Sequence, residues 1–284
     1  MGSGGCFMQD CWFYERHTDG YEVRWRITGI LHQETTPFQK LAVIETVEWG
    51  RALVLDGVLQ LADKDEYIYH EMITHIAMNG HPHPQDVLII GGGDGGAVRE
   101  AVKHQHLRHL DLVEIDQRVV EISQQYFPRV ASAFADPRVN LHFADGFDYI
   151  KNPLRQYDLV IVDSSDPVGP SLKLFSVEFY RDLHKILKPD GMAVVQSESP
   201  VFYTDHFAAC HANLRQVFPI TEVYLAPIAT YVSGPWAFTV GSKQHDPRII
   251  NNDQPVTTGL QYYTEELHRA AFCLPGFVRK LISS

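Results

Sequence analysis

The sequence predicts an α/β protein with a small antiparallel β domain at the N-terminus and a larger doubly wound domain after it. Residues from about 12 to 61 are rich in β-branched and aromatic residues and lack helical periodicity. After residue 65, short apolar runs alternate with amphipathic segments, which is typical of a parallel sheet covered by helices. A glycine-rich loop follows the first of these runs. We therefore expect two domains, residues 1–64 and 65–284.

Composition limits the function classes that fit this chain. Its 284 residues carry a net charge of −11, which argues against a nucleic-acid or anionic-membrane partner. The four cysteines form no C-x-x-C pair, so we expect no zinc site, no disulfide framework and a cytoplasmic location. No apolar run is long enough to span a bilayer, and we expect no signal peptide.

Alternation and turn residues predict the N-terminal β domain. Residues Tyr21 to Ile27 alternate between polar and apolar, and residues 41–47 are rich in β-branched side chains. Asp56-Gly57 separates two apolar runs and suits a two-residue hairpin turn, because both residues tolerate a positive φ. We expect this sheet to form a module of its own.

Periodicity predicts the elements of the larger domain in turn. A helix from Asp65 to about Asn79 ends at His81-Pro82-His83-Pro84, where the prolines break it. We then expect strands over 87–90, 110–115, 140–143, 159–162 and 193–196, and helices over 97–104, 118–127, 147–150, 177–187 and 205–218. Segments 221–226 and 236–241 are expected to close the sheet as a hairpin, with one strand antiparallel to the rest.

The loop Gly91-Gly92-Gly93-Asp94-Gly95-Gly96 lies between the first of these strands and its helix. This order is typical of a nucleotide-binding βαβ unit, and the loop also matches G-x-G-x-x-G. A pyrophosphate would lie against the helix N-terminus, where the Asp94 carboxylate would repel it. Asp94 therefore indicates a nucleoside with a cationic substituent.

Carboxylates follow four successive predicted strands. Because parallel strands end at one edge of a sheet, we expect Asp94, Glu114, Asp145 and Asp163 to lie along that edge. Glu114 is placed to accept both hydroxyls of a ribose, and Asp145 to accept from an adenine amino group, with close backbone approach at Gly146. The remaining acids would then face a positively charged group, which fits a sulfonium nucleoside with an aminoalkyl arm.

Asp163 and Asp166 precede Pro167-Val168-Gly169-Pro170. The prolines predict a loop without helix, and two carboxylates three residues apart there can bind an ammonium group, one of them as its base. A metal site is not expected: the two histidines of His70-Glu71-Met72-Ile73-Thr74-His75 are five residues apart and point to different sides of a helix.

From Trp12 to about Lys280 the chain resembles the spermidine synthase (polyamine aminopropyltransferase) family, whose fold is Rossmann-like and of the methyltransferase type. The motifs that carry the resemblance are Leu55-Asp56-Gly57-Val58-Leu59-Gln60, Asp65-Glu66-Tyr67-Ile68-Tyr69-His70-Glu71-Met72, the loop at 91–96, Val113-Glu114-Ile115-Asp116, Asp145-Gly146, residues 163–170, Tyr262-Tyr263 and His268-Arg269-Ala270-Ala271-Phe272. The resemblance implies transfer of an aminopropyl group from decarboxylated S-adenosylmethionine to putrescine. The products would be spermidine and methylthioadenosine.

The resemblance also implies roles for individual residues, without metal or cofactor. The donor site would comprise Gln39, His70, Asp94, Glu114, Asp145, Gly146 and Pro170. Asp163 would deprotonate the attacking amine, and the acceptor site would comprise Tyr69, Tyr231, Asp166, Gln196, Gln60, Trp12 and Trp236. The family usually has proline where Ala229 precedes Thr230-Tyr231, which leaves cadaverine as an alternative acceptor. A homodimer or homotetramer is implied as well.

Three alternatives remain at this point. The first is an S-adenosylmethionine-dependent putrescine N-methyltransferase, against which His70 and the run Asp65 to Tyr69 argue. The second is a nicotinamide oxidoreductase, which the G-x-G-x-x-G match favours and Asp94 disfavours. The third is a polyamine-binding protein without catalytic activity.

Overall fold

The computed structural model describes residues 11–165 and 169–283, and it divides the chain into two compact units, Met1–Asp65 and Glu66–Ser284. The division lies one residue after the boundary expected from the sequence. Within the described residues, no helix combines the length and the apolar character needed to cross a membrane.

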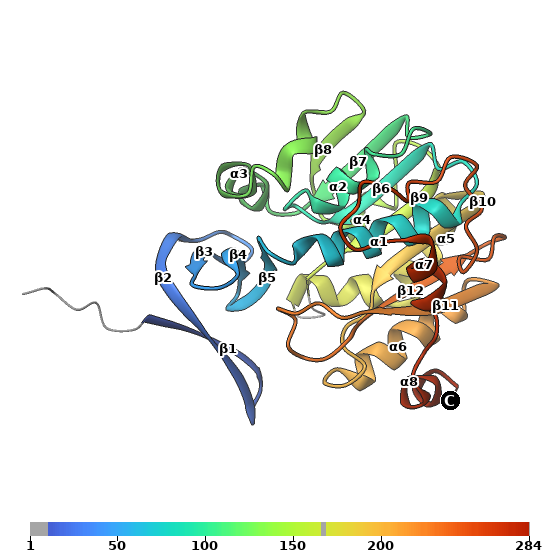
Figure 1. The fold of residues 1–284 in the computed structure, drawn as a ribbon. Helices are drawn as coiled ribbons and strands as arrows, with labels where there is room; N and C mark the ends of the chain where they lie inside the picture. The colour runs from blue at the N-terminus through green and yellow to red at the C-terminus, as the bar shows by residue number, and fades with distance from the viewer. Residues whose placement is uncertain (1–10, 166–168, 284) are drawn as a thin grey trace, which may run out of the picture. The chain divides into compact units, whose positions relative to one another are not determined.

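The N-terminal unit is a five-stranded antiparallel sheet in which each strand pairs with the next (Figure 1). Its strands are β1 (Cys11–Thr18), β2 (Tyr21–Thr35), β3 (Lys40–Thr46), β4 (Gly50–Leu55) and β5 (Val58–Ala62). Asp56 and Gly57 have φ values of 50° and 87°, the two positive angles that the predicted tight turn requires. Glu15 is buried because it accepts hydrogen bonds from the Trp25 indole (2.9 Å) and the Leu59 amide (3.2 Å).

The second unit contains a seven-stranded sheet with the order β11-β12-β10-β9-β6-β7-β8. These strands are β6 (Asp86–Gly91), β7 (His109–Glu114), β8 (Val139–Phe143), β9 (Tyr157–Asp163), β10 (Leu187–Gln196), β11 (Ile220–Ala226) and β12 (Trp236–Ser242). Strands β10, β9, β6, β7 and β8 are parallel to one another, whereas β12 is antiparallel to both of its neighbours. The predicted parallel sheet with a terminal antiparallel hairpin is confirmed.

Helices cover both faces of this sheet (Figure 1). They are α1 (Glu66–Gly80), α2 (Gly96–Ala101), α3 (Gln117–Tyr126), α4 (Gly146–Tyr149), α5 (Val177–Ile186), α6 (Thr204–Arg215), α7 (Glu265–Ala270) and α8 (Gly276–Ile282). Val87 and Ile89 of β6 belong to the same core cluster as side chains of α1 and α2, whereas Leu88 and Ile90 belong to a second cluster with side chains of α5 and α6. Alternate residues of a strand face opposite sides of the sheet, so this continuous apolar run contributes to the hydrophobic cores on both faces.

Some elements of the second unit differ from the sequence-based expectation, among them β10, which begins at Leu187 and not at 193. A 3₁₀ helix spans Gly169–Phe175, although Pro170 predicted a loop without helix. Proline is tolerated in a first helical turn, where its missing N–H would have no partner in any case. The helices α7 and α8 were not predicted. Glu71 of α1 accepts hydrogen bonds from the amides of residues 261–263, which ties the C-terminal segment to the unit.

Candidate active site

The four predicted carboxylates follow four adjacent parallel strands. Asp163 ends β9, Asp94 follows β6, Glu114 ends β7 and Asp145 follows β8, and the strands occupy neighbouring positions in that order. Gly91 of β6 pairs with Asp163 of β9, so both strands end at the same level. The predicted row of acids at one edge of the sheet is therefore present.

The glycine loop is glycine-rich because other residues of this edge pack directly against it. Gly91 has a φ of +79°, and a Cβ there would lie 2.2 Å from the Asp163 carbonyl oxygen. A Cβ on Gly96 would lie 2.2 Å from the His70 ring. Real side chains do not approach so closely, so these glycines are needed before any ligand binds. The sequence had suggested only that they allow a nucleoside to approach.

Asp163 is a partly buried carboxylate whose two oxygens have different surroundings. Its Oδ1 accepts a hydrogen bond of 2.6 Å from the Tyr69 hydroxyl, while its Oδ2 has no hydrogen-bond partner among the residues that the structure describes. Burial and the nearby charge of Asp94 raise the pKa of Asp163 to about 6. A carboxylate with this pKa is ionised at neutral pH and basic enough to take a proton.

Asp94 contacts a cation of the protein itself. Its Oδ1 lies 3.2 Å from His70 Nε2 and accepts a hydrogen bond of 2.7 Å from the Gly96 amide. Burial would raise the pKa of Asp94, but the His70 charge and these hydrogen bonds lower it below its usual value. For His70, burial is outweighed by Asp94 and Glu66, which raise its pKa to about 10. Asp94 is thus held as an anion.

Glu114 bridges the glycine loop and the end of β7. It accepts hydrogen bonds from the Gly93 amide (3.2 Å) and the Asp116 amide (2.9 Å). Burial raises the pKa of Glu114 to about 7, although these two hydrogen bonds oppose the shift. A carboxylate held by backbone amides at a strand end is suitably placed to accept ribose hydroxyls.

Asp145 and Gly146 begin α4. The Asp145 side chain caps the helix by accepting a 2.8 Å hydrogen bond from the Phe147 amide. A Cβ on Gly146 would lie 2.4 Å from Ile90 Cγ2, so only glycine lets this turn pack on β6. Helix capping alone would explain why an acidic residue stands at this position.

Aromatic rings lie beside the Asp163–Tyr69 pair. The Tyr231 ring centroid is 5.8 Å from that of Tyr69 and 4.8 Å from that of Trp236. Gln196 is buried at the end of β10, and its Nε2 donates a 3.1 Å hydrogen bond to the Ser164 carbonyl. The structure thus brings Tyr69, Tyr231 and Trp236 together, and ties Gln196 to the residue that follows Asp163.

Several predicted site residues are not placed beside this group. Trp12, Gln39 and Gln60 belong to the N-terminal unit, and their part in a site stays a prediction. Asp166 lies outside the described residues, and Pro170 is described only as part of the 3₁₀ helix.

Sequence reasoning did not single out Glu66 or Arg99. Glu66 Oε2 lies 2.6 Å from His70 Nδ1, and Arg99 donates to both Glu66 oxygens at 2.8 and 2.9 Å. The spacing of Glu66 and His70, four residues apart on a predicted helix, is the signal that could have revealed the pair. His75 points elsewhere, as predicted, and contacts Glu100 and His104.

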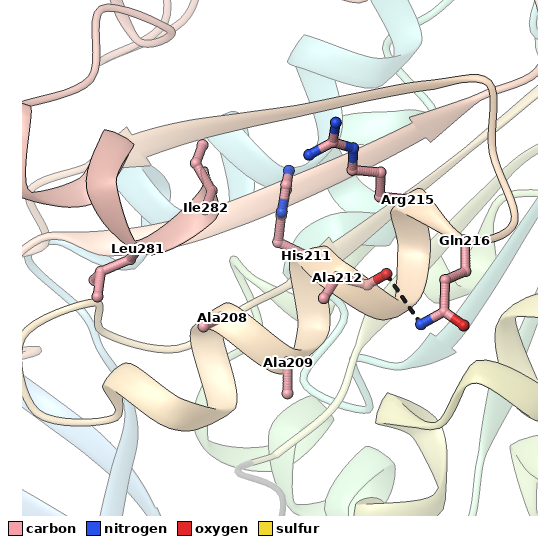
Figure 2. A pocket seen from close by; sticks show the side chains of 8 residues that line it. All are labelled: Ala208, Ala209, His211, Ala212, Arg215, Gln216, Leu281 and Ile282. Carbon is pink, nitrogen blue, oxygen red and sulfur yellow. Dashed lines mark hydrogen bonds between the residues drawn. The ribbon is translucent and has the colours of Figure 1, made fainter. Parts of the chain in front are cut away.

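A pocket between α6 and α8 is separate from these residues (Figure 2). Its lining includes Ala208, Ala212 and Ile282, together with the cationic Arg215. None of the described residues that line it is a carboxylate. The pocket therefore lacks the charge that would attract a cationic substrate.

Comparison with known proteins connects the site to a family. A sequence profile described as "Spermine/spermidine synthase domain" matches residues 66–252, and one described as "Spermidine synthase tetramerisation domain" matches residues 11–63. The chain belongs to the spermine/spermidine synthase family. The family resemblance seen in the sequence motifs is confirmed.

Individual relatives agree over nearly the full chain. The polyamine aminopropyltransferase of Desulforudis audaxviator is 46% identical over 94% of this chain and 97% of its own length. That of Moorella thermoacetica is 44% identical over 98% of each. Among solved structures, a spermidine synthase in complex with the transition-state analogue AdoDATO has a TM-score of 0.91 at 35% identity, covering 97% of this chain and 96% of its own. Thermotoga maritima spermidine synthase has a TM-score of 0.88 at 34% identity, covering 97% and 95%.

These findings establish the enzyme class. The chain is an aminopropyltransferase, a transferase of polyamine biosynthesis, and the expected fold is that of the solved spermidine synthases. Two of the alternative functions, the nicotinamide oxidoreductase and the polyamine-binding protein without catalytic activity, are therefore excluded.

Proposed function

We propose that the enzyme transfers the aminopropyl group of decarboxylated S-adenosylmethionine to putrescine, giving spermidine and methylthioadenosine. The observation that carries this proposal is the Asp163 carboxylate, whose buried Oδ2 has no partner among the described residues and whose pKa is raised by the nearby charge of Asp94. Two partly buried anions at one edge of the sheet suit two cationic substrates. The similar spermidine synthase that binds the transition-state analogue AdoDATO supports the same class of reaction.

We assign the donor to the glycine-loop side of the edge. Glu114 would accept the ribose hydroxyls, and Asp145 the adenine amino group beside Gly146. Asp94 would bind the ammonium of the aminopropyl arm. Gln39, His70 and Pro170 complete the donor site in this proposal, by the family motif they match.

Asp163 would bind and deprotonate the attacking amine of putrescine. An alkylammonium has no lone pair and a pKa of about 10.4 by analogy with lysine, so the reaction needs a base. The proton passes to Asp163, and the nitrogen lone pair forms a bond to the carbon next to sulfur. The carbon–sulfur bond breaks, and its electrons convert the sulfonium into the neutral thioether of methylthioadenosine. In-line positioning of nitrogen, carbon and sulfur supplies about 7–11 kcal/mol of the barrier reduction.

The rest of the acceptor site would orient the diamine. Tyr69 and Tyr231 flank the attacking amine, and Asp166, with Gln196 through a water molecule, receives the distal ammonium. Trp12, Gln60 and Trp236 would line the acceptor site. Because the sulfonium is already a good leaving group, we propose that the reaction needs no metal and no further cofactor.

A substrate panel tests this function. Purified enzyme is incubated in EDTA with decarboxylated S-adenosylmethionine and putrescine, cadaverine or 1,3-diaminopropane. We expect methylthioadenosine and a triamine in equal amounts, fastest with putrescine. A preference for cadaverine would correct the acceptor, whereas turnover only with intact S-adenosylmethionine, giving a methylated diamine, would replace the proposal with the methyltransferase alternative. No product with any diamine, or none until metal is restored, would contradict it.

We further propose that the enzyme is a homotetramer assembled through its N-terminal unit. The profile that matches residues 11–63 is named for tetramerisation. Within this unit, Trp12, Tyr14 and Ile30 are large apolar residues with 42%, 54% and 56% of their surfaces exposed. Trp12 and Tyr14 lie two residues apart on β1 and therefore face the same side of the sheet, whereas Ile30 lies on the neighbouring strand β2. Large exposed apolar side chains are candidates for an interface.

Light scattering on a gel-filtration column tests the assembly. We expect the wild type to elute at four times the chain mass of 32.3 kDa. Ile30→Asp is expected to shift the enzyme to a smaller species, because it places a charge in an apolar contact. Thr18→Asp, at the exposed end of β1, is the control and should remain tetrameric. A monomeric wild type, or an Ile30→Asp variant that is still tetrameric, would contradict the proposed interface.

A further inference from the structure

His70 lies between two carboxylates in the second unit. Its Nδ1 is 2.6 Å from Glu66 Oε2 and its Nε2 is 3.2 Å from Asp94 Oδ1. A neutral imidazole has one N–H, so it can donate to only one of two carboxylates. The ring donates to both only as an imidazolium, and His70 is 2% exposed, which keeps water from substituting for either contact.

Arg99 holds Glu66 in the position that this arrangement needs. Its two terminal nitrogens donate to the two Glu66 oxygens, and its Nε donates to Glu100 Oε1 at 2.8 Å. A bidentate guanidinium–carboxylate pair fixes the plane of the carboxylate as well as its place. Glu66 is 8% exposed, so the carboxylate that faces His70 has little freedom to turn toward solvent.

The chemistry of the site creates a need for this cation. Asp94 and Asp163 are both partly buried, and the charge of Asp94 raises the pKa of Asp163. Without a counter-charge, two such neighbouring carboxylates favour sharing one proton. A proton shared in this way would occupy the base that the transfer reaction requires. An imidazolium beside Asp94 opposes that outcome, and the His70 charge lowers the pKa of both Asp94 and Asp163.

We propose that Glu66, clamped by Arg99, holds His70 as the imidazolium that keeps Asp94 and Asp163 both ionised before the substrates bind. Glu66 and Arg99 are then positioning residues, which act on the reaction through His70. The inference rests on the proposed function, because it takes Asp163 as the base. Among the described residues, the other charged or titratable groups around His70, Asp94 and Asp163 are Tyr69 of α1, Glu114 of β7 and Tyr231 between β11 and β12.

Glu66→Gln tests the inference because it removes the charge and keeps the shape. Without Glu66 the imidazolium loses one of its two carboxylates, so more of His70 is neutral at pH 7.5. Asp163 then loses a neighbouring cation, so its pKa rises. The pKa below which kcat/KM falls at low pH is expected to increase by about one unit or more. Glu66→Asp, which retains the charge, is expected to restore most of the wild-type profile. Glu121→Gln, which removes an exposed carboxylate paired with Arg118, is the control and should leave the profile unchanged.

Nitrogen-15 NMR of the histidine rings gives a readout that does not depend on turnover. In the wild type we expect both His70 nitrogens to stay protonated from pH 6 to above pH 8. A wild-type His70 that loses its proton near pH 6.5 would overturn the inference even if no variant folds. An acid limb unchanged in Glu66→Gln would also overturn it. By contrast, an inactive wild type with a protonated His70 would contradict the proposed function, whereas an active wild type with a neutral His70 would contradict this inference alone.

Discussion

Replacement of Asp163 by asparagine is expected to lower kcat by about 10²–10⁴-fold, while the affinity for the donor stays close to that of the wild type. Asparagine keeps an oxygen that can accept the Tyr69 hydrogen bond, but it cannot take a proton from the attacking ammonium. Rapid-quench measurement of methylthioadenosine at saturating donor and diamine gives kcat, and calorimetry gives donor affinity. Turnover within threefold of the wild type would remove Asp163 from the role of base.

Thermal unfolding is the control for this variant. The pKa of Asp163 is about 6 in the folded protein and about 3.9 in an unfolded chain. The folded state therefore binds this proton more tightly, so ionised Asp163 lowers stability as the pH rises from about 4 to 6, and the whole cost is present above pH 6. Asparagine carries no such cost. We expect Asp163→Asn to unfold at the same or a higher temperature at pH 7.5, so that lost activity is not lost structure.

Replacement of Asp94 by asparagine is expected to weaken donor binding by roughly 100-fold, the scale of a lost hydrogen bond between charged groups. The loss has two sources. The ammonium of the aminopropyl arm loses its carboxylate, and the His70 imidazolium, still held by Glu66, then repels it.

Methylthioadenosine provides a matched ligand for this measurement because it lacks the aminopropyl arm. Calorimetry should give similar affinities of wild type and Asp94→Asn for methylthioadenosine, and very different affinities for decarboxylated S-adenosylmethionine. Equal weakening for both ligands would mean that Asp94 supports the nucleoside or the loop rather than the amine. Unchanged donor affinity would remove Asp94 from the site.

Much of the second unit was predictable because its signals are local. The apolar runs that became β6 and β9 are buried on both faces, and the acids that follow them lie at one edge by the geometry of parallel strands. The helices α7 and α8 were missed because each is short and depends on contacts far away in the sequence, such as those of Glu71 with residues 261–263. The helix at Gly169–Phe175 was missed because proline disrupts the interior of a helix but is tolerated in its first turn.

The chemistry of the site was less predictable than its location. In the sequence, Asp94 is an acidic residue in a glycine-rich loop, and we predicted that its carboxylate is free to bind a cationic ligand. The structure shows that His70 already contacts this carboxylate, with Glu66 and Arg99 behind it. Such a chain joins residues 33 positions apart and depends on side-chain geometry, which no local pattern encodes. A cytoplasmic location stays a prediction.

The pH dependence of kcat/KM tests the central claim, that a partly buried carboxylate at residue 163 removes a proton from one of two cationic substrates. At substrate concentrations well below saturation, the wild-type kcat/KM is expected to fall about tenfold per pH unit below a pKa near 6, where Asp163 of the free enzyme becomes protonated. In Asp163→Asn the remaining slow reaction should show no limb at that pH. A limb near pH 6 that persists in the variant would assign the proton to another group and contradict the account.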